Sequence, residues 1–336
     1  MTVPSKRACA AIGIDLGGTN LRGAVVENGK LVGEPVYVET PDHPEKIVDA
    51  LVKLIEDLLE EAQTSGLQRD AICGVGIATA GVVNCDTGEV IGSTGNLPGW
   101  AGTKIREVVE ARTGLSVHVE NDANAAAYGE ARVEELKNLH CIVVVTLGTG
   151  IGGGIVIDGK LLHGRGWAAG EIGHMSIALD DSRLCTCGLH NCWEAYGSGR
   201  GLLATARELL AEKNDEGQDS TLFEVGEAEL TTYKVFQEAK AGDLLACAIV
   251  RRWHEHITTG IVNLTHILNP DCFVITGGLS QACDLALLKE LTVEKALHNI
   301  GETVEIRASM LDTNAGLIGA AQSVIDEVGA GVPARR

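Results

Sequence analysis

The sequence is poor in positive charge and contains no long uninterrupted apolar run. Lysine and arginine number 27 against 46 aspartates and glutamates, so the net charge is −19. A surface this negative repels phosphate backbones, so we expect no nucleic acid, anionic membrane or long polyanion as a partner. The longest apolar stretch, 141–157, contains five glycines and a turn signal, and is therefore not expected to span a membrane.

The composition is otherwise that of a folded globular protein. Apolar residues make up 45% and charged residues 22% of the 336 residues, which excludes a disordered chain. The N-terminus has too short an apolar segment for a signal peptide, so we expect a cytoplasmic protein. A chain of this length is expected to form two domains.

Glycine is abundant, at 42 residues, and predicts many tight turns. Apolar residues at helical or alternating spacing predict a mixture of helices and strands, an α/β fold. The predicted strands are 10–15, 21–27, 31–38, 71–78, 115–120, 141–146, 154–157, 160–163 and 271–276. The predicted helices are 44–62, 103–113, 122–132, 198–213, 243–268, 285–299 and 315–328.

A pattern near the N-terminus recurs about 130 residues later. LGGTNLRGAVVENGKL (Leu16–Leu31) and LGTGIGGGIVIDGKL (Leu147–Leu161) both read as a glycine turn, an apolar strand, a second turn and Gly-Lys-Leu. We interpret the recurrence as an internal duplication, which predicts two similar α/β domains.

Each copy carries a glycine turn directly after a predicted strand. Gly148, Gly150 and Gly153 have the spacing G-x-G-x-x-G, but a strand rather than a helix is predicted to follow, so a Rossmann site is excluded. The first turn lacks the Gly-Lys-Ser/Thr of a Walker A loop. The alternative is that both are plain hairpin turns. Two copies, each with several backbone N–H groups in one concavity, favour phosphate binding.

Two acidic residues lie where predicted strands end. Asp15 could hold Mg²⁺ beside a phosphate or serve as an Asx-turn residue, and its spacing does not separate the two. The segment Glu-Asn-Asp-Ala-Asn, 120–124, begins a predicted helix, where one of its residues is expected to be the N-cap. Asp122 near this helix N-terminus is expected to stay ionised and could accept a hydroxyl proton as a general base.

The ten cysteines are of two kinds. Cys185, Cys187 and Cys192, with His174 upstream, offer three thiolates and an imidazole, which suit a structural tetrahedral zinc site, and His190 is a rival fourth ligand. Such a site would fix Glu171 and Glu194, two acids that could grip sugar hydroxyls. The scattered cysteines are interpreted as small buried hydrophobic residues: Cys9, Cys73, Cys85, Cys141, Cys247, Cys272 and Cys283.

Together these motifs resemble the ROK family of repressors and sugar kinases, within the actin/hexokinase/Hsp70-like ATPases. The resemblance covers nearly the whole chain. It is carried by IGIDLGGTN (Ile12–Asn20), ENDANAAAYGE (Glu120–Glu130), TLGTGIGGG (Thr146–Gly154), GEIGH (Gly170–His174), CTCGLHNCWE (Cys185–Glu194) and ITGGLS (Ile275–Ser280). GNLPGW (Gly95–Trp100) and CWEAYGSGR (Cys192–Arg200) look most like the bacterial glucokinases of the family.

The resemblance implies two duplicated actin-like (ribonuclease H-like) ATPase domains, residues 1–120 with 315–330 and residues 121–314, around a cleft. Asp122 would take the proton of the sugar 6-hydroxyl. The residues expected to bind the sugar are Gly81, Thr94, Asn96, Asn121, Asp122, Glu171, His174 and Glu194. Those expected to bind ATP and Mg²⁺ are Asp15, Gly17, Gly18, Thr19, Asn20, Arg22, Thr146, Gly148, Thr149, Gly150, Gly277 and Gly278. His174 would ligate zinc with one ring nitrogen and meet the sugar with the other.

The implied activity is ATP-dependent phosphorylation of a hexose, with glucose expected first and fructose, mannose or an N-acetylated hexosamine as alternatives. A homodimer is also implied. The alternatives from another class are a sugar-responsive repressor and a catalytically idle sugar-binding protein. The first strand is predicted near residue 10, which leaves no room for the helix-turn-helix of repressor relatives, and Asp15, Asp122 and both glycine turns speak against an idle protein. Two departures from the family pattern are Ala80, where proline is frequent, and Asn191, where glycine is common. Asn tolerates left-handed backbone, so we expect the second turn to survive.

Overall fold

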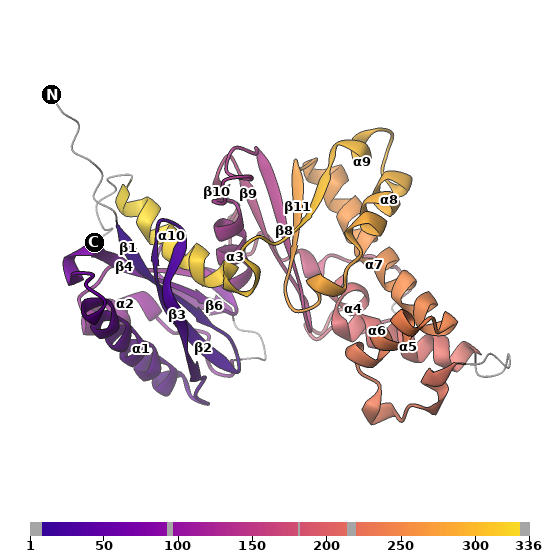
Figure 1. Ribbon diagram of the computed structural model, residues 1–336, viewed down its shortest axis with the longest axis horizontal. Helices are drawn as coiled ribbons and strands as arrows, with labels where there is room; N and C mark the ends of the chain where they lie inside the picture. The colour runs from indigo at the N-terminus through magenta and orange to yellow at the C-terminus, as the bar shows by residue number, and fades with distance from the viewer. Residues whose placement is uncertain (1–8, 93–96, 181, 214–219, 330–336) are drawn as a thin grey trace. The chain divides into compact units, whose positions relative to one another are not determined.

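The computed structural model describes residues 9–92, 97–180, 182–213 and 220–329, and is shown in Figure 1. Its contacts divide the chain into two compact units. Unit 1 comprises Met1–Leu139, Gly154–Gly170 and Met310–Arg336, and unit 2 comprises His140–Gly153 and Glu171–Ser309. Among the described residues, no helix combines the length and the apolar character needed to cross a membrane.

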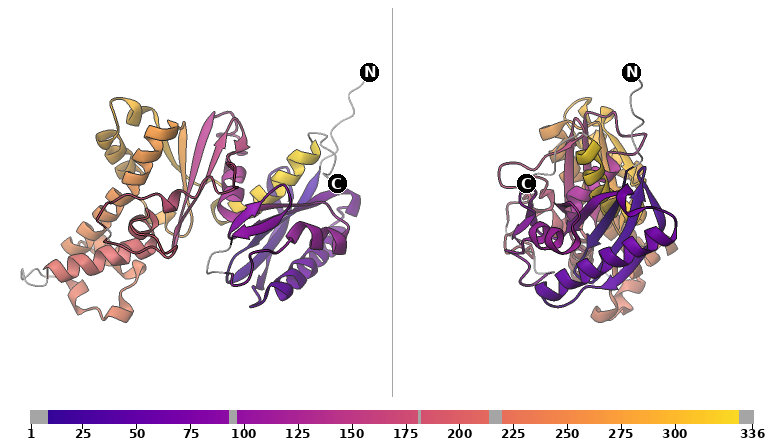
Figure 2. Two further views of the ribbon diagram at one scale, coloured as in Figure 1. Left: turned by 180° about the vertical axis from the view of Figure 1, so that it is seen from behind. Right: turned by 90° about the vertical axis from the view of Figure 1, so that its left-hand side faces the viewer.

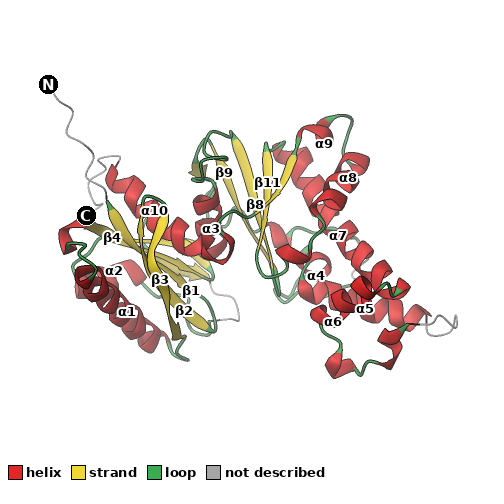
Figure 3. Ribbon diagram, in the orientation of Figure 1, coloured by secondary structure: helices red, strands yellow, loops and turns green. Residues whose placement is uncertain are grey.

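Unit 1 is built on a five-stranded sheet of order β3-β2-β1-β4-β7. Strands β1, β4 and β7 are parallel, and β2 and β3 add an antiparallel meander. Figure 3 shows the strands in yellow. The strands are β1 (Ala10–Leu16), β2 (Asn20–Glu27), β3 (Lys30–Glu39), β4 (Ile72–Thr79), β5 (Val82–Asn84), β6 (Glu89–Gly92) and β7 (Val117–Asn121). The helices are α1 (Pro44–Thr64), α2 (Ile105–Thr113), α3 (Asp122–Glu130) and α10 (Ala315–Gly329).

The alternation of side chains along β1 explains how helices cover both faces of this sheet. Ile12 and Ile14 point to one face and belong to the core that contains the apolar side of α1. Ala11 points to the other face and packs with Leu317 of α10. The views in Figures 1 and 2 accordingly place α1 and α10 on opposite faces of the sheet.

Small residues bring α10 unusually close to its neighbours. A Cβ on Gly76 of β4 would overlap the carbonyl oxygen of Ala320, and one on Gly13 would overlap that of Leu317. A Cβ on Gly319 of α10 would likewise overlap the carbonyl oxygen of Ala125 on α3. Glycine therefore allows α10 to lie directly on the sheet and on α3.

Unit 2 contains most of a second five-stranded sheet, of order β10-β9-β8-β11-β12. Its order repeats that of the first sheet with equivalent strands, which confirms the predicted internal duplication. The strands are β8 (Cys141–Leu147), β9 (Ile151–Ile157), β10 (Lys160–Leu161), β11 (Cys272–Thr276) and β12 (Glu305–Ala308). The helices are α4 (Glu194–Gly197), α5 (Gly199–Lys213), α6 (Thr232–Ala241), α7 (Leu244–Leu268), α8 (Leu285–Lys295) and α9 (Ile300–Thr303).

Several details differ from the sequence predictions. The helix expected over 285–299 ends at Lys295, and the hairpin β5–β6, helix α6 and strand β12 were not predicted. Contacts divide the chain differently from the expected boundary at residue 120, because α3 packs on α10. The segment 154–170 also groups with unit 1.

The interpretation of the scattered cysteines as small buried hydrophobic residues is wrong for three of them. Cys9 and Cys73 form a disulfide, with Cα atoms 6.0 Å apart. Strand β1, which follows Cys9, pairs with β4, which contains Cys73, so the two sulfurs meet. Cys247 is exposed on α7.

Candidate active site

The first glycine turn joins β1 to β2 and presents exposed residues. Gly18, Thr19 and Asn20 are exposed, and Gly17 N donates to Asn20 O at 3.0 Å across the turn. Thr40 holds the turn from outside, because its hydroxyl donates to Gly17 O at 2.8 Å and its N–H donates to Thr19 O. The predicted phosphate turn is thus anchored at its base and open at its tip.

Asp15 and Arg22 face each other across the hairpin. They are register partners on β1 and β2, and Arg22 Nε and Nη2 both donate to Asp15 Oδ2, at 3.0 and 2.6 Å. The same guanidinium donates to Thr313 O. The positive charge of Arg22 is therefore paired with the Asp15 carboxylate. Both hydrogen bonds go to Oδ2, so Asp15 Oδ1 takes no part in this ion pair.

Asp122 begins α3 at the end of β7, beside Asn121. Asn121 is the N-cap, since its Oδ1 accepts from Ala123 N at 3.0 Å and Asn124 N at 3.1 Å. Its Nδ2 donates to Gly81 O at 2.9 Å. Gly81 has φ 105° and approaches the Gly92 backbone too closely for a Cβ, so glycine is required there.

The first turn of α10 lies beside both Asp15 and the backbone of Asp122. A Cβ on Gly316 would lie 3.5 Å from Asp15 Oδ2 and 3.8 Å from the Asp122 carbonyl oxygen. Two segments about 100 residues apart in the sequence thus meet at one helix end. Thr94 and Asn96, also predicted to bind the sugar, lie outside the described residues.

Glu120 anchors the segment that carries Asp122. Its side chain is 2% exposed, and its Oε1 accepts from Asn121 N at 2.9 Å and from Asn124 Nδ2 at 3.2 Å. Its Oε2 lies 2.7 Å from His163 Nε2. Burial is the largest single influence on Glu120 and works to raise its pKa, but the lowering contributions, led by the hydrogen bond with His163 and the charge of that imidazole, together hold the pKa below its ordinary value. The same bond raises the pKa of His163.

The second glycine turn, in unit 2, joins β8 to β9 and is held by Glu194. Glu194 Oε2 accepts from Ile151 N at 3.0 Å, and a Cβ on Gly150 would overlap this oxygen. Arg200 Nε donates to Thr149 O at 3.1 Å, and Nη2 of the same guanidinium donates to Glu194 Oε1 at 3.5 Å. Glu194 was predicted to bind sugar, and the structure shows it in contact with the second glycine turn, which was predicted to bind phosphate.

The other predicted nucleotide residues lie around the same end of β8. Thr146 pairs in register with Thr276 at the end of β11, and the Gly277-Gly278 pair follows. Gly277 has φ 92° and no room for a Cβ beside the Leu147 backbone. Among the described residues, the buried Thr146 hydroxyl has no hydrogen-bond partner. Thr146, Gly148 and Gly277 are therefore neighbours, as the prediction requires.

The predicted metal ligands of unit 2 converge. The donor atoms of His174, Cys185, Cys187 and Cys192 all lie within 4.8 Å of one another, and His190 is not in this group. The sulfurs of Cys187 and Cys192 are 3.6 Å apart, and Cys185 Sγ lies 3.8 Å from His174 Nδ1. A zinc tetrahedron with Zn–S bonds of about 2.3 Å has sulfur–sulfur edges of about 3.8 Å, so the donor set fits zinc.

This group of His174, Cys185, Cys187 and Cys192, called the cysteine knot below, is surrounded by residues in defined orientations. Asn191 has φ 59°, the left-handed backbone predicted for that turn, and is buried. His174 Nε2, the ring nitrogen on the side away from Cys185, lies 3.9 Å from Glu171 Oε2. One imidazole thus faces the thiols with one nitrogen and an acid with the other.

Comparison with known proteins supports this reading of the motifs. The model of the ROK family matches residues 11–327. A glucokinase from Streptomyces coelicolor is 34% identical over 316 residues, which cover 92% of this chain and 96% of that protein. The crystal structure of a ROK family glucokinase from Streptomyces griseus in complex with glucose and AMPPNP is 31% identical, with a TM-score of 0.74, and covers 94% of this chain and 99% of that one. A xylose repressor from Caldicellulosiruptor bescii is 29% identical over 330 residues, covering 96% of this chain and 80% of the repressor.

The chain belongs to the ROK family. The expected family is therefore confirmed, and the two sheets of equal strand order have the actin-like fold predicted from it. The ROK motifs divide between the two units: Asp15, Asn121 and Asp122 lie in unit 1, and Glu171, His174 and Glu194 lie in unit 2. The expected boundary at residue 120 had placed Asn121 and Asp122 with the second group.

Four residues that support these ROK motifs were not assigned a role from the sequence. Thr40 and Arg200 hold the two glycine turns, and His163 pairs with Glu120. Of the four, only Glu120 could have been noticed in the sequence, because it is an acid that directly follows the alternating apolar residues of β7. The other three contact their targets across 23 to 51 residues of sequence.

Proposed function

We propose that this ROK protein transfers the γ-phosphate of ATP to the 6-hydroxyl of a hexose, and that glucose is the preferred hexose. The observation that carries the proposal is the rigid presentation of Asp122, held at the start of α3 by the Asn121 cap and by Glu120. Glucokinases of 31–34% identity along nearly the whole chain support it.

Asp122 is assigned the role of general base. A carboxylate at a helix N-terminus is stabilised by the helix dipole and is ready to accept a hydroxyl proton. Phosphoryl transfer mainly requires alignment and charge neutralisation, so a weak base that receives the proton late is sufficient. Asn121, Gly81, Glu171 and His174 would position the sugar.

The two glycine turns and Gly277-Gly278 would bind the nucleotide through backbone N–H groups. Asp15 would hold Mg²⁺ through Oδ1, directly or through water, since Oδ2 accepts both bonds from Arg22. When bound, Mg²⁺ neutralises phosphate charge during transfer. Arg22 keeps Asp15 oriented, and Glu194 with Arg200 keeps the second turn in shape.

The knot of His174, Cys185, Cys187 and Cys192 is proposed to hold a structural zinc ion. All four coordination places are filled by protein, so the ion would supply rigidity rather than catalysis. Rigidity matters here because Thr186 between two ligands donates to Glu194 Oε1 at 3.0 Å. The knot would therefore fix Glu194 and His174 together.

We expect Cys187→Ser to release the metal and to lower stability and sugar affinity together. Elemental analysis should find about one zinc per wild-type chain and much less in the variant. Cys247→Ser, which removes an exposed cysteine on α7, is the matched control and should keep its zinc. A wild-type protein purified without stoichiometric zinc would contradict the assignment.

The activity is tested by ADP release from Mg-ATP with glucose, mannose, fructose, N-acetylglucosamine and N-acetylmannosamine. Asp122→Asn should lower kcat about 10²- to 10⁴-fold while circular dichroism stays unchanged. Asp57→Asn, which alters an exposed acid of α1, should leave kcat unchanged. Turnover on another sugar would keep the mechanism and change the substrate. Sugar binding without turnover on any of them would favour a sensor.

The remaining expectations stay predictions that rest on composition and family. These are a cytoplasmic location, a homodimer, a place in glycolysis, and no nucleic acid or membrane partner.

A further inference from the structure

A second group of metal-ligating side chains lies in unit 1, away from the cysteine knot. Cys85 follows β5, Glu120 lies on β7 and His163 follows β10, and their donor atoms all lie within 4.8 Å of one another. Cys85 Sγ is 3.3 Å from Glu120 Oε2, and His163 Nε2 is 2.7 Å from the same oxygen. A thiol, a carboxylate and an imidazole from three separate segments thus converge on one point.

The central member of the group is held in place before any ligand arrives. Glu120 is almost completely buried, and its other oxygen, Oε1, accepts from Asn121 N and Asn124 Nδ2. Such second-layer bonds orient carboxylate ligands in metal sites. Oε2 therefore points at Cys85 and His163 because the rest of the carboxyl group is fixed.

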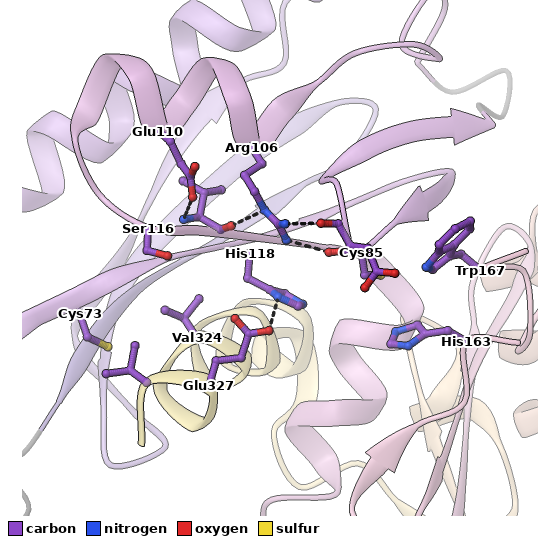
Figure 4. A pocket seen from close by; sticks show the side chains of 13 residues that line it. Cys73, Cys85, Arg106, Glu110, Ser116, His118, His163, Trp167, Val324 and Glu327 are labelled. Carbon is purple, nitrogen blue, oxygen red and sulfur yellow. Dashed lines mark hydrogen bonds and ion pairs between the residues drawn. The ribbon is translucent and has the colours of Figure 1, made fainter. Parts of the chain in front are cut away.

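Two members of the group open onto a cavity. Cys85 and His163 line a pocket of about 470 Å³, together with Asp86, His118 and Trp167. Figure 4 shows Cys85 and His163 on the same side of this pocket, close to Trp167. The pocket gives an entry path and room for a water molecule beside the three donor atoms.

We propose that Cys85, Glu120 and His163 form a second transition-metal site that binds Zn²⁺ with its fourth position open to this pocket. A set of one thiolate, one imidazole and one carboxylate is suited to zinc and not to Mg²⁺ or Ca²⁺, which require oxygen ligands. Three protein ligands with an accessible fourth position distinguish this site from the closed cysteine knot.

Both the charge and the geometry of the group allow a divalent metal ion to replace two protons. Binding would release the thiol proton of Cys85 and the second ring proton of His163, so a divalent ion replaces two protons and the net charge of the buried group stays unchanged. Bonds of about 2.0 Å to nitrogen and oxygen place these two atoms about 3.3 Å apart in a tetrahedron. His163 must therefore withdraw by about 0.6 Å from its 2.7 Å contact, and its partly exposed position leaves room for this shift.

The test begins with protein whose cysteine knot has been loaded with zinc and freed of excess metal. Co²⁺ is then added as a spectroscopic probe, and Zn²⁺ is titrated in competition. We expect one further metal per chain, with the absorption of a cobalt–thiolate bond. Cys85→Ser should abolish that absorption, and either Cys85→Ser or His163→Gln should weaken binding about tenfold or more. Cys247→Ser should change neither quantity.

Two results would overturn the proposal. One is that no metal binds beyond the knot equivalent. The other is that the cobalt spectrum and affinity persist in both Cys85→Ser and His163→Gln, which would place the ion in the knot by exchange. His163 is partly exposed, so His163→Gln decides the question even where Cys85→Ser disturbs folding.

Discussion

His256 on α7 is a half-buried base beside positively charged side chains. Burial first, and then the charges of Arg183 and Arg252, lower the pKa of His256 to about 4. Among the described residues, its Nδ1 has no hydrogen-bond partner. The unfolded chain binds a proton there below about pH 6.5. Unfolding therefore takes up a proton between about pH 6.5 and 4, and the free energy of unfolding falls as the pH is lowered through this window.

Across this pH window, the lowered pKa of His256 reduces the free energy of unfolding by about 3 kcal/mol. We expect His256→Gln to show a shallower loss of stability than wild type between pH 6.5 and 4, measured by urea denaturation. His298→Gln, at an exposed position away from the cysteine cluster, should follow the wild-type curve. Equal pH slopes for His256→Gln and wild type would show that His256 is protonated in the folded protein.

Single residues differ in how far the sequence predicts their role. Asp15, Asn121 and the three clustered cysteines could be assigned roles because each belongs to a short motif with its own chemistry. Glu120 was not assigned, because Cys85 and His163 lie 35 and 43 residues away in the sequence. Arg22 was assigned to phosphate, and its partner Asp15 became apparent only when the register of β1 and β2 placed them opposite each other.

Among the secondary-structure elements, α10 depends most on residues without side chains. Gly76→Ala would drive a methyl group into the Ala320 backbone, and neither β4 nor α10 has a flexible side chain there that could yield. We expect a loss of about 3 kcal/mol in the free energy of unfolding, the upper range for an overpacked core. Gly166→Ala, which meets no atom within 4 Å, should stay within about 0.5 kcal/mol of wild type. A mild effect of Gly76→Ala, measured by urea denaturation, would mean that α10 can move off the sheet.

The elements that the sequence predicted have either a clear apolar period or a continuous apolar run. Helix α1 has the helical period because one face is buried, and the strands around Ile12 and Val144 are apolar runs because both faces are buried. The hairpin β5–β6 and strand β12 are short, and three or four residues are too few to show a period. The sequence could not show why glycine is needed at positions 13 and 76, because the helix that packs on them, α10, lies at the far end of the chain.

At the scale of the whole molecule, the sequence predicted the duplication but not the division into units. Repeated motifs reveal two equivalent sheets because each copy must build the same turn and strand pair. The segment 154–170 belongs to the second copy by sequence, yet groups with unit 1 through contacts such as His163 with Glu120. Sequence periodicity reports local structure and carries no information about such long-range partners.

The net charge of −19 is also a property of the whole molecule, and it bears on the phosphoryl donor. At the proposed site, ATP would place its three phosphates on the glycine turns and Mg²⁺, whereas long-chain polyphosphate would continue across the acidic surface. That repulsion acts over a Debye length of about 8 Å at physiological salt and over longer distances at low salt. We expect glucose turnover with polyphosphate to be at least about 100-fold below that with ATP at low ionic strength, with the ratio narrowing as salt is added. Saturating Mg²⁺ and glucose in both series separate this effect from metal or sugar binding. A ratio that salt does not change would place the discrimination in the local fit of the nucleotide instead of the overall charge.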